Sequence, residues 1–151
     1  MSKLAPKPLN LEASPIWKEA DRIAEFMFTL SDTVSDDERW LSYHKMRQAS
    51  SDLIFYVSMA LGNGSPGGQE YEWGLARKSV AGLKTMYRFA ARRGVFAIDP
   101  KMMVSLDKLI KVIDKELKQA YDRADAVDER SLKPWLKKYK MWQEMSKEPK
   151  I

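Results

Sequence analysis

The chain has 151 residues, of which 44% are hydrophobic and 31% charged, with no cysteine and a net charge of +5. This length and apolar content suffice for one domain with its own core and exclude a chain that is disordered throughout. The lack of cysteine excludes disulfides and metal sites built on thiolates. No apolar run is long enough to span a membrane, and residues 1–11 lack the apolar segment of a signal peptide, so we expect a cytoplasmic protein without a membrane partner.

Residues 1–13 form a proline-containing leader that we expect to be flexible. Ser14 and Pro15 then predict the start of a first helix. Serine can cap the free N–H groups of a first turn, and proline at the first helical position lacks only an N–H that would have no partner. The core-facing side of this helix is predicted to consist of Ile16, Ala20, Ile23, Ala24, Met27 and Leu30.

A second helix is predicted from Ser35 to about Leu61. Residues 35–38 read Ser-Asp-Asp-Glu, the pattern of a capping box with acidic side chains at the positive end of the helix dipole. Further along, mostly apolar residues recur at spacings that alternate between three and four, so they lie on one side of the helix. This spacing is typical of long helices packed nearly parallel to one another. Its members are Trp40, Tyr43, Arg47, Ser50, Ile54, Val57 and Leu61.

Residues 62–68 contain four glycines and a proline, and we interpret them as a flexible connection between helices. A phosphate-binding loop is the alternative interpretation of such a glycine-rich segment. No strand is predicted before it, and the Gly-Lys-Ser/Thr ending of nucleotide-binding loops is absent.

A third helix is predicted from about Gln69 to Arg93, ended by Gly94, because glycine readily adopts the left-handed conformation that closes a helix. Its core-facing side is predicted to consist of Leu75, Ser79, Gly82, Leu83, Met86, Phe89 and Ala90. Gly74 and Gly82 each cost about 1 kcal/mol of helix propensity relative to alanine. We therefore expect them to permit the close approach of a neighbouring helix.

Asp99 and Pro100 predict the start of a fourth helix, which extends to about Ala126. Its core-facing side is predicted to consist of Met103, Leu106, Ile110, Ile113, Leu117, Ala120 and Ala124. Together the pattern predicts an all-α protein, an up-down antiparallel four-helix bundle over residues 14–126. Residues 127–151 are predicted to form a basic and aromatic C-terminal extension, with a short docked helix that begins at Pro134.

Residues suited to catalysis are scarce. The neighbours of the only histidine, His44, one turn away are Trp40 and Gln48, neither of which is a metal ligand in practice. The sequence offers no arrangement typical of a Ser–His–Asp triad and no Glu-x-x-His motif of di-iron bundles. We therefore expect neither an enzyme nor a bound cofactor or metal, and interpret His44 as a buried or interface residue.

Basic residues of the third helix are the first candidate site. Lys84, Arg88 and Arg92 are spaced four residues apart and must share a face, where like charges repel one another. Such a row can follow the phosphates of a nucleic acid or meet an acidic partner. The alternative is an ordinary charged face whose acids come from neighbouring helices. The predicted nucleic-acid-binding residues here are Arg77, Lys84, Arg88, Arg92 and Arg93.

The C-terminal extension is the second candidate site. Residues 131–151 carry a net charge of +4, so the first 130 residues carry only about +1. Lys137, Lys138 and Lys140 alternate with aromatic residues, a mixture that can combine phosphate attraction with base stacking. The spacing of Trp135, Tyr139 and Trp142 is instead typical of a docked helix, so we favour packing across the bundle or against a partner subunit.

Two segments carry a resemblance to a known family. They are Met46-Arg47-Gln48-Ala49 with Asp52-Leu53, and Ala81-Gly82-Leu83-Lys84-Thr85-Met86-Tyr87-Arg88-Phe89, followed by the turn Gly94-Val95-Phe96-Ala97-Ile98-Asp99-Pro100. With these, the chain resembles the four-helix-bundle family of ribosomal-RNA intervening-sequence proteins and the accessory variability determinant of diversity-generating retroelements. The resemblance implies a homopentamer that binds RNA or DNA and, in the retroelement branch, a reverse transcriptase.

These patterns lead to two functional hypotheses. The first is a non-catalytic accessory scaffold that binds nucleic acid and a reverse transcriptase. The second is a protein–protein interaction module with no nucleic-acid role, whose aromatic extension docks on a partner or a sister subunit.

Overall fold

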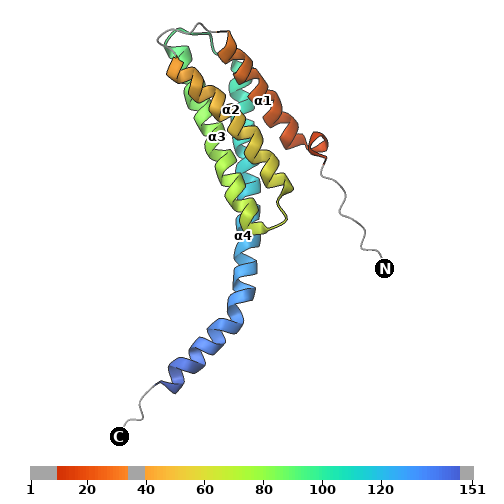
Figure 1. Cartoon of the computed structure of the whole chain (residues 1–151), viewed down its shortest axis with the longest axis vertical. Coiled ribbons are helices and arrows are strands. Elements are labelled where there is room, and N and C mark those ends of the chain that lie inside the picture. Colours follow the sequence, from red (N-terminus) through yellow and green to blue (C-terminus); the bar gives the residue numbers. More distant parts are fainter. Residues whose placement is uncertain (1–9, 34–39, 147–151) are drawn as a thin grey trace.

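The computed structural model describes residues 10–33 and 40–146, and these residues are helical with no strands. A short 3-10 helix, η1 (Leu11–Ala13), precedes α1 (Pro15–Asp32), α2 (Trp40–Gly62), α3 (Pro66–Arg92) and α4 (Pro100–Met145). In Figure 1, α1, α2, α3 and the first part of α4 lie side by side, and the rest of α4 projects beyond them. The predicted leader up to residue 9 and the predicted capping box at 35–38 lie outside the described residues.

The predicted starts of the first and fourth helices are confirmed. The Ser14 hydroxyl accepts a hydrogen bond from the backbone N–H of Trp17 at 3.3 Å, with Pro15 at the first helical position. The Asp99 carboxylate accepts one from the N–H of Lys101 at 2.9 Å, and Pro100 follows it. Both caps satisfy donors that have no partner inside the helix.

The glycine-rich segment holds the predicted connection between helices, but the connection itself is shorter than 62–68 and consists of residues 63–65. Ser65 caps α3 by accepting a hydrogen bond from the N–H of Gly68 at 3.1 Å, so α3 begins one turn before the predicted Gln69. A Cβ atom on Gly68 would collide with the Asn63 side chain. The Gln69 side chain also donates to the Asn63 carbonyl at 2.6 Å. A side chain at position 68 would therefore displace the Asn63 side chain, whose Oδ1 accepts a hydrogen bond from the backbone N–H of Ser65 at 2.9 Å.

All four α-helices contribute to one core. Helix α2 packs against α1 and α3, α3 packs against α4, and α1 also touches α4. The buried hydrophobic residues of this core are Ala20, Ile23, Met27, Met46, Leu53, Val57, Ala60, Trp73, Ala76, Val80, Leu83, Tyr87, Ala90, Met102, Leu106, Leu109, Ile113 and Ala120. Apolar burial therefore joins the described helices as far as Ala120 of α4, and such packing stabilises helices far more than intrinsic propensity does.

The predicted core face of α1 is confirmed, because Ala20, Ile23, Ala24 and Met27 are buried. In α2 and α4 the prediction holds in part. It found Tyr43, Ser50, Val57, Leu106, Ile113 and Ala120, but missed Met46, Leu53, Ala60, Met102 and Leu109. A helix in a bundle buries a face wider than one narrow seam, so residues on both sides of that seam become buried.

The predicted core face of α3 is mostly wrong. Only Leu83 and Ala90 of the predicted set are buried, whereas the observed face is Trp73, Ala76, Val80, Leu83, Tyr87 and Ala90. The predicted residues instead form a second apolar side of the helix, and several of them line a groove between α2 and α3. Phe89 is 46% exposed. Two apolar stripes lie side by side on α3, and periodicity alone did not tell which one faces inward.

Tyr87 fixes the connection between α3 and α4. Its side chain is fully buried, and its hydroxyl accepts a hydrogen bond from the backbone N–H of Asp99 at 2.8 Å. The ring stacks on Phe96 with centroids 5.3 Å apart and meets the ring of Phe26 edge-on at 6.2 Å. Gly94 adopts φ +73°, which confirms the predicted left-handed end of α3.

Arg47, a polar member of the predicted apolar side of α2, has a structural role there. Arg47 donates from Nε to the Ser31 hydroxyl at 2.9 Å, and its guanidinium forms an ion pair with Asp32. The same guanidinium lies 5.2 Å from the centre of the Phe28 ring. Arg47 therefore joins α2 to the end of α1 by charge, hydrogen bonding and cation–π contact.

Helix α4 does not end near Ala126. It runs without interruption to Met145 and includes Pro134, so the prediction of a separate short helix is wrong for the described residues. None of the helices in the described ranges is both long and apolar enough to cross a membrane.

We expect Tyr87→Phe to lower the free energy of unfolding by about 1–3 kcal/mol, because it leaves the N–H of Asp99 without its acceptor. Urea unfolding followed by circular dichroism measures the change. Tyr71→Phe is the control, because the Tyr71 side chain is exposed. Equal effects of the two variants would contradict the anchoring role.

We expect Gly74→Ala and Gly82→Ala each to raise the free energy of unfolding by about 0.5–1 kcal/mol. A Cβ atom at either position meets no heavy atom within 4 Å, so the predicted close helix approach is wrong in the described chain. Gly94→Ala is the matched control and should lower stability, because φ is +73° there. A loss of stability in the two helical variants would show that these glycines face a packed neighbour.

Candidate functional site

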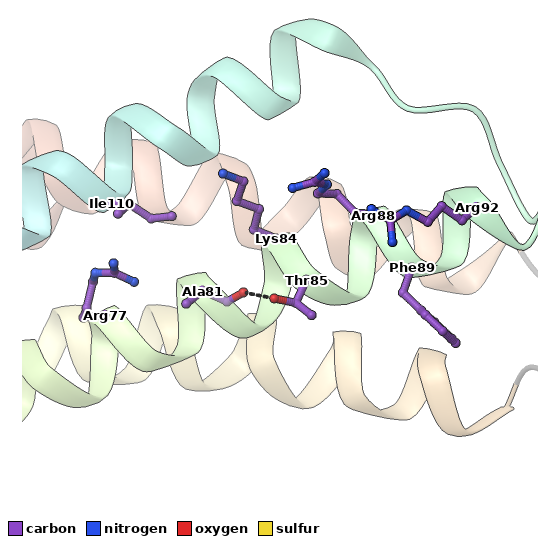
Figure 2. Close-up of a pocket in the computed structure, with 8 residues that line it drawn as sticks. All are labelled: Arg77, Ala81, Lys84, Thr85, Arg88, Phe89, Arg92 and Ile110. Carbon is purple, nitrogen blue, oxygen red and sulfur yellow. Dashed lines mark hydrogen bonds between the residues drawn. The ribbon is translucent and has the colours of Figure 1, made fainter.

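Four of the predicted cationic residues lie along one side of α3. Arg77, Lys84, Arg88 and Arg92, here called the α3 stripe, line a groove of about 440 Å³ beside α4. Figure 2 shows them in sequence along the helix, with Arg77 at one end of the groove and Arg92 at the other. The remaining lining residues are Ala81, Thr85, Phe89 and Ile110. The structure therefore brings the stripe together around an apolar floor.

Two members of the stripe are paired with acids of α4. Arg77 Nε donates to Asp114 at 2.7 Å, and Lys84 Nζ donates to Asp107 at 2.5 Å. The two aspartates are seven residues apart and so lie on one side of α4. For these two cations, the alternative interpretation, in which neighbouring helices supply the acids, is confirmed. Such partly exposed ion pairs contribute about 0–1 kcal/mol each, so an anion can displace them.

Arg88 and Arg92 differ from the other two. Both side chains are exposed, and neither forms an ion pair with any acid in residues 10–33 or 40–146. Figure 2 shows them at the end of the groove away from Arg77. Positive charge within the stripe is therefore concentrated at its C-terminal end.

Phe89 belongs to the same end of the groove, although its spacing predicts a core residue. Its ring is half-exposed and lines the groove, and Figure 2 shows it pointing away from the side chains of Arg88 and Arg92. The guanidinium of Arg93, the fifth predicted cation of α3, lies 5.9 Å from the centre of this ring and outside the groove lining. In the sequence, Phe89 follows Arg88 and precedes Arg92 by three residues, and this arrangement could have indicated an exposed aromatic residue.

The predicted C-terminal residues lie on a different part of the molecule. We call residues 121–145 of α4 the arm, because Ala120 is the last fully buried residue of the helix. Lys137, Lys138 and Lys140 are exposed on the arm, which projects at the end of the molecule opposite the end of α3 that holds Arg92 (Figure 1). The structure therefore does not join these lysines with the α3 stripe into one surface.

The predicted aromatic contact residues are also on the arm. Trp135, Tyr139 and Trp142 are 71%, 50% and 64% exposed, so they do not pack across the bundle of their own chain. The rings of Tyr139 and Trp142 stack on each other at 6.2 Å. Their role in binding a partner or a sister subunit stays a prediction.

A second groove, of about 530 Å³, lies between α2 and α3. Its apolar lining includes Tyr56, Leu75 and Met86, with Lys45, Asp52 and Lys78 among its charged residues. Sequence reasoning missed this groove because it assigned the second apolar side of α3 to the core. Mixed charge around the groove gives it no preference for an anion.

The described residues hold no group of three or more His, Asp or Glu side chains that could bind a metal ion. His44 is exposed on α2 and is not buried in the core. No protein-family model matches the chain, and no curated protein matches its sequence.

We expect Asp107→Asn with Asp114→Asn to raise the affinity for a single-stranded RNA about tenfold, because the change frees Lys84 and Arg77 for phosphates. Fluorescence anisotropy with a labelled oligonucleotide measures the affinity. Asp21→Asn with Glu25→Gln on α1 is the control with the same change of net charge. An equal gain in both variants would show that net charge alone, and not the stripe, attracts RNA.

Proposed function

We propose that the chain is a non-catalytic accessory protein, a homo-oligomeric scaffold that binds nucleic acid and a reverse transcriptase of a diversity-generating retroelement. The observation that supports this most is the α3 stripe, in which Arg88 and Arg92 remain without acidic partners among the described residues. The resemblance of the helix-two and helix-three segments supplies the retroelement context and the pentamer, and a cytoplasmic location is part of the same proposal. The up-down four-helix bundle with a C-terminal extension is part of the same proposal.

Phosphate recognition explains how the groove would work. An arginine guanidinium can donate two parallel hydrogen bonds to a phosphate, and Arg88 and Arg92 offer two such groups one helical turn apart. The exposed ring of Phe89, which points away from the two arginine side chains in Figure 2, can stack on a base beside them. Contacts of this kind position a nucleic acid without reading its sequence, so specificity would come from the protein partner.

The acids of α4 would order the binding events. A phosphate reaching Lys84 or Arg77 must displace Asp107 or Asp114, whereas Arg88 and Arg92 require no such exchange. Binding would therefore begin at the C-terminal end of α3 and extend along the stripe. Affinity would be modest and strongly dependent on salt.

A protein–protein interaction module without a nucleic-acid role is the second candidate. It is favoured by the exposed aromatic residues of the arm, because aromatic side chains are enriched in protein interfaces and rarely exposed together without a partner.

We expect Arg88→Glu with Arg92→Glu to weaken the binding of single-stranded RNA by about tenfold or more. The slope of log affinity against log salt should also fall by about 1 for each lost phosphate contact. Salt-titrated anisotropy measures both quantities.

Lys18→Glu with Lys45→Glu is the matched control, because it changes the net charge equally at exposed positions on α1 and α2. The proposal predicts a much smaller loss for this variant. If the native chain shows no salt-dependent RNA binding, or the two variants lose equal affinity, the nucleic-acid role is wrong and the interaction module is favoured.

A further inference from the structure

Three exposed aromatic residues of the arm share one side of the helix. Trp135, Tyr139 and Trp142 are spaced by four and three residues, which places them within about 60° of one another around the helix axis. All three are at least half-exposed, and the rings of Tyr139 and Trp142 stack on each other. We call these three residues the aromatic side of the arm. Anchors at positions i, i+4 and i+7 are typical of a helix that binds in an apolar groove.

Most lysines of the arm face the other way. Lys133, Lys137 and Lys140, here called the lysine side, lie about 140–160° around the helix from Trp135. A nucleic acid held by the lysine side would therefore leave the aromatic side uncovered. Only Lys138, about 60° from Trp135, lies at the edge of the aromatic side.

The arm does not reach a groove of its own chain. Helix α4 is continuous to Met145, and Trp135 lies about 22 Å beyond Ala120 at the rise of an α-helix. Figure 1 shows the arm projecting beyond the other helices. Any cover for its aromatic side therefore comes from another molecule.

The groove between α2 and α3 has the shape that such a helix requires. Tyr56, Leu75 and Met86 are among its apolar lining residues, and a Cβ atom on Gly82 in the same lining would meet no heavy atom within 4 Å. Gly82 therefore leaves room for a large side chain from outside. The lining from Leu75 to Met86 spans about 16 Å along α3, whereas the three aromatic anchors span about 10 Å along the arm.

Exposed apolar side chains continue beyond the groove toward the α2–α3 corner. Met59 follows Tyr56 by three residues on α2, and Tyr71 precedes Leu75 by four on α3, so each lies about one turn further along the same side of its helix. Both Met59 and Tyr71 are exposed. The groove therefore lies within a larger region of exposed apolar side chains, which is typical of a protein interface.

Charge favours the arm as the occupant of the groove. The lining holds Lys45, Lys78 and one acid, Asp52. The Asp52 carboxylate accepts a hydrogen bond from the Gln48 side chain and forms no ion pair with any described side chain. An arm bound through its aromatic side keeps the lysine side away from the two groove lysines, while Lys138 can approach Asp52.

We propose that the aromatic side of the arm of one copy of this chain binds in the α2–α3 groove of a second copy. The contact joins two different surfaces, so repeated contacts close into a ring or continue as a filament. This inference deepens the homo-oligomeric part of the proposed function and rests on it, but it does not require nucleic-acid binding.

Removal of the aromatic side should weaken association of the full chain. We expect the native protein to be a multimer at micromolar concentration in analytical ultracentrifugation. Trp135→Gln with Trp142→Gln should weaken association by about tenfold or more, because buried aromatic anchors carry much of the binding energy of an interface. Leu136→Gln with Met141→Gln is the matched control, since these exposed residues lie about 100–120° from Trp135. A monomeric native chain, or equal losses in the two variants, would overturn the proposal.

Gly82→Gln tests the groove. The new side chain would occupy the groove without a change of charge, so association should weaken by about tenfold or more. Gly74→Gln is the matched control, because its Cβ atom also meets no heavy atom within 4 Å but Gly74 does not line the groove. Circular dichroism should show the native helix content in both variants. Native association of Gly82→Gln would exclude the groove as the binding site.

Mixing the two deficient proteins distinguishes this contact from a pairing of two arms. The Gly82→Gln chain keeps an intact arm, and the Trp135→Gln, Trp142→Gln chain keeps an intact groove. The mixture should therefore form a 1:1 dimer, although neither protein associates alone. If the arms paired with each other or bound RNA instead, the mixture would stay monomeric and the proposal would be wrong.

RNA binding is measured separately on the same proteins. Arg88 and Arg92 are unaltered in every variant, so failure of the native chain to bind RNA refutes the nucleic-acid role and leaves the arm contact standing. A multimer that keeps its mass in every variant refutes the arm contact and leaves the homo-oligomeric scaffold standing.

Discussion

The packing of α3 into the core is the constraint on which the candidate site depends. Six residues from Trp73 to Ala90 alternate at three- and four-residue spacing and face inward. Once that face is fixed, residues 77, 84 and 88 must lie along the side of the helix next to α4. The same packing brings Asp107 and Asp114 within reach of the stripe. The positions of the charges therefore follow from which apolar side of α3 is buried.

Sequence patterns predicted the order and the beginnings of the helices well. Ser14-Pro15 and Asp99-Pro100 act through local chemistry, since a cap and a proline need only their own first turn. Gly94 likewise depends on one backbone angle. Ser65-Pro66 follows the same rule, although the neighbouring glycines made this helix start harder to predict, and the contact of the Asn63 side chain with Gly68 could not be predicted from spacing. Contacts of that kind become visible only in three dimensions.

The candidate site was predicted only in part, for a similar reason. The row of cations on α3 could be read from spacing, but the pairing of two of them depends on how α4 is rotated against α3. Phe89 was assigned to the core because α3 has two adjacent apolar sides, and only packing decides between them. The docked helix expected after Ala126 is instead a continuation of α4, because Pro134 can be accommodated within an exposed helix.

The described chain thus has two separate surfaces with different physical properties. The α3 stripe is a groove in which cations surround an apolar floor, and it suits an anion. The arm exposes aromatic side chains and carries opposite charges in successive blocks. The two surfaces lie toward opposite ends of the molecule (Figure 1).

Mapping the RNA contact by NMR tests the central claim most directly. A short single-stranded RNA is titrated into isotope-labelled protein, and the backbone amide shifts are followed residue by residue. The account predicts that the largest changes lie at the C-terminal half of α3 and at residues 107–114 of α4, and that they disappear at high salt. Changes confined to the arm or to the groove between α2 and α3, or no changes at all, would contradict it.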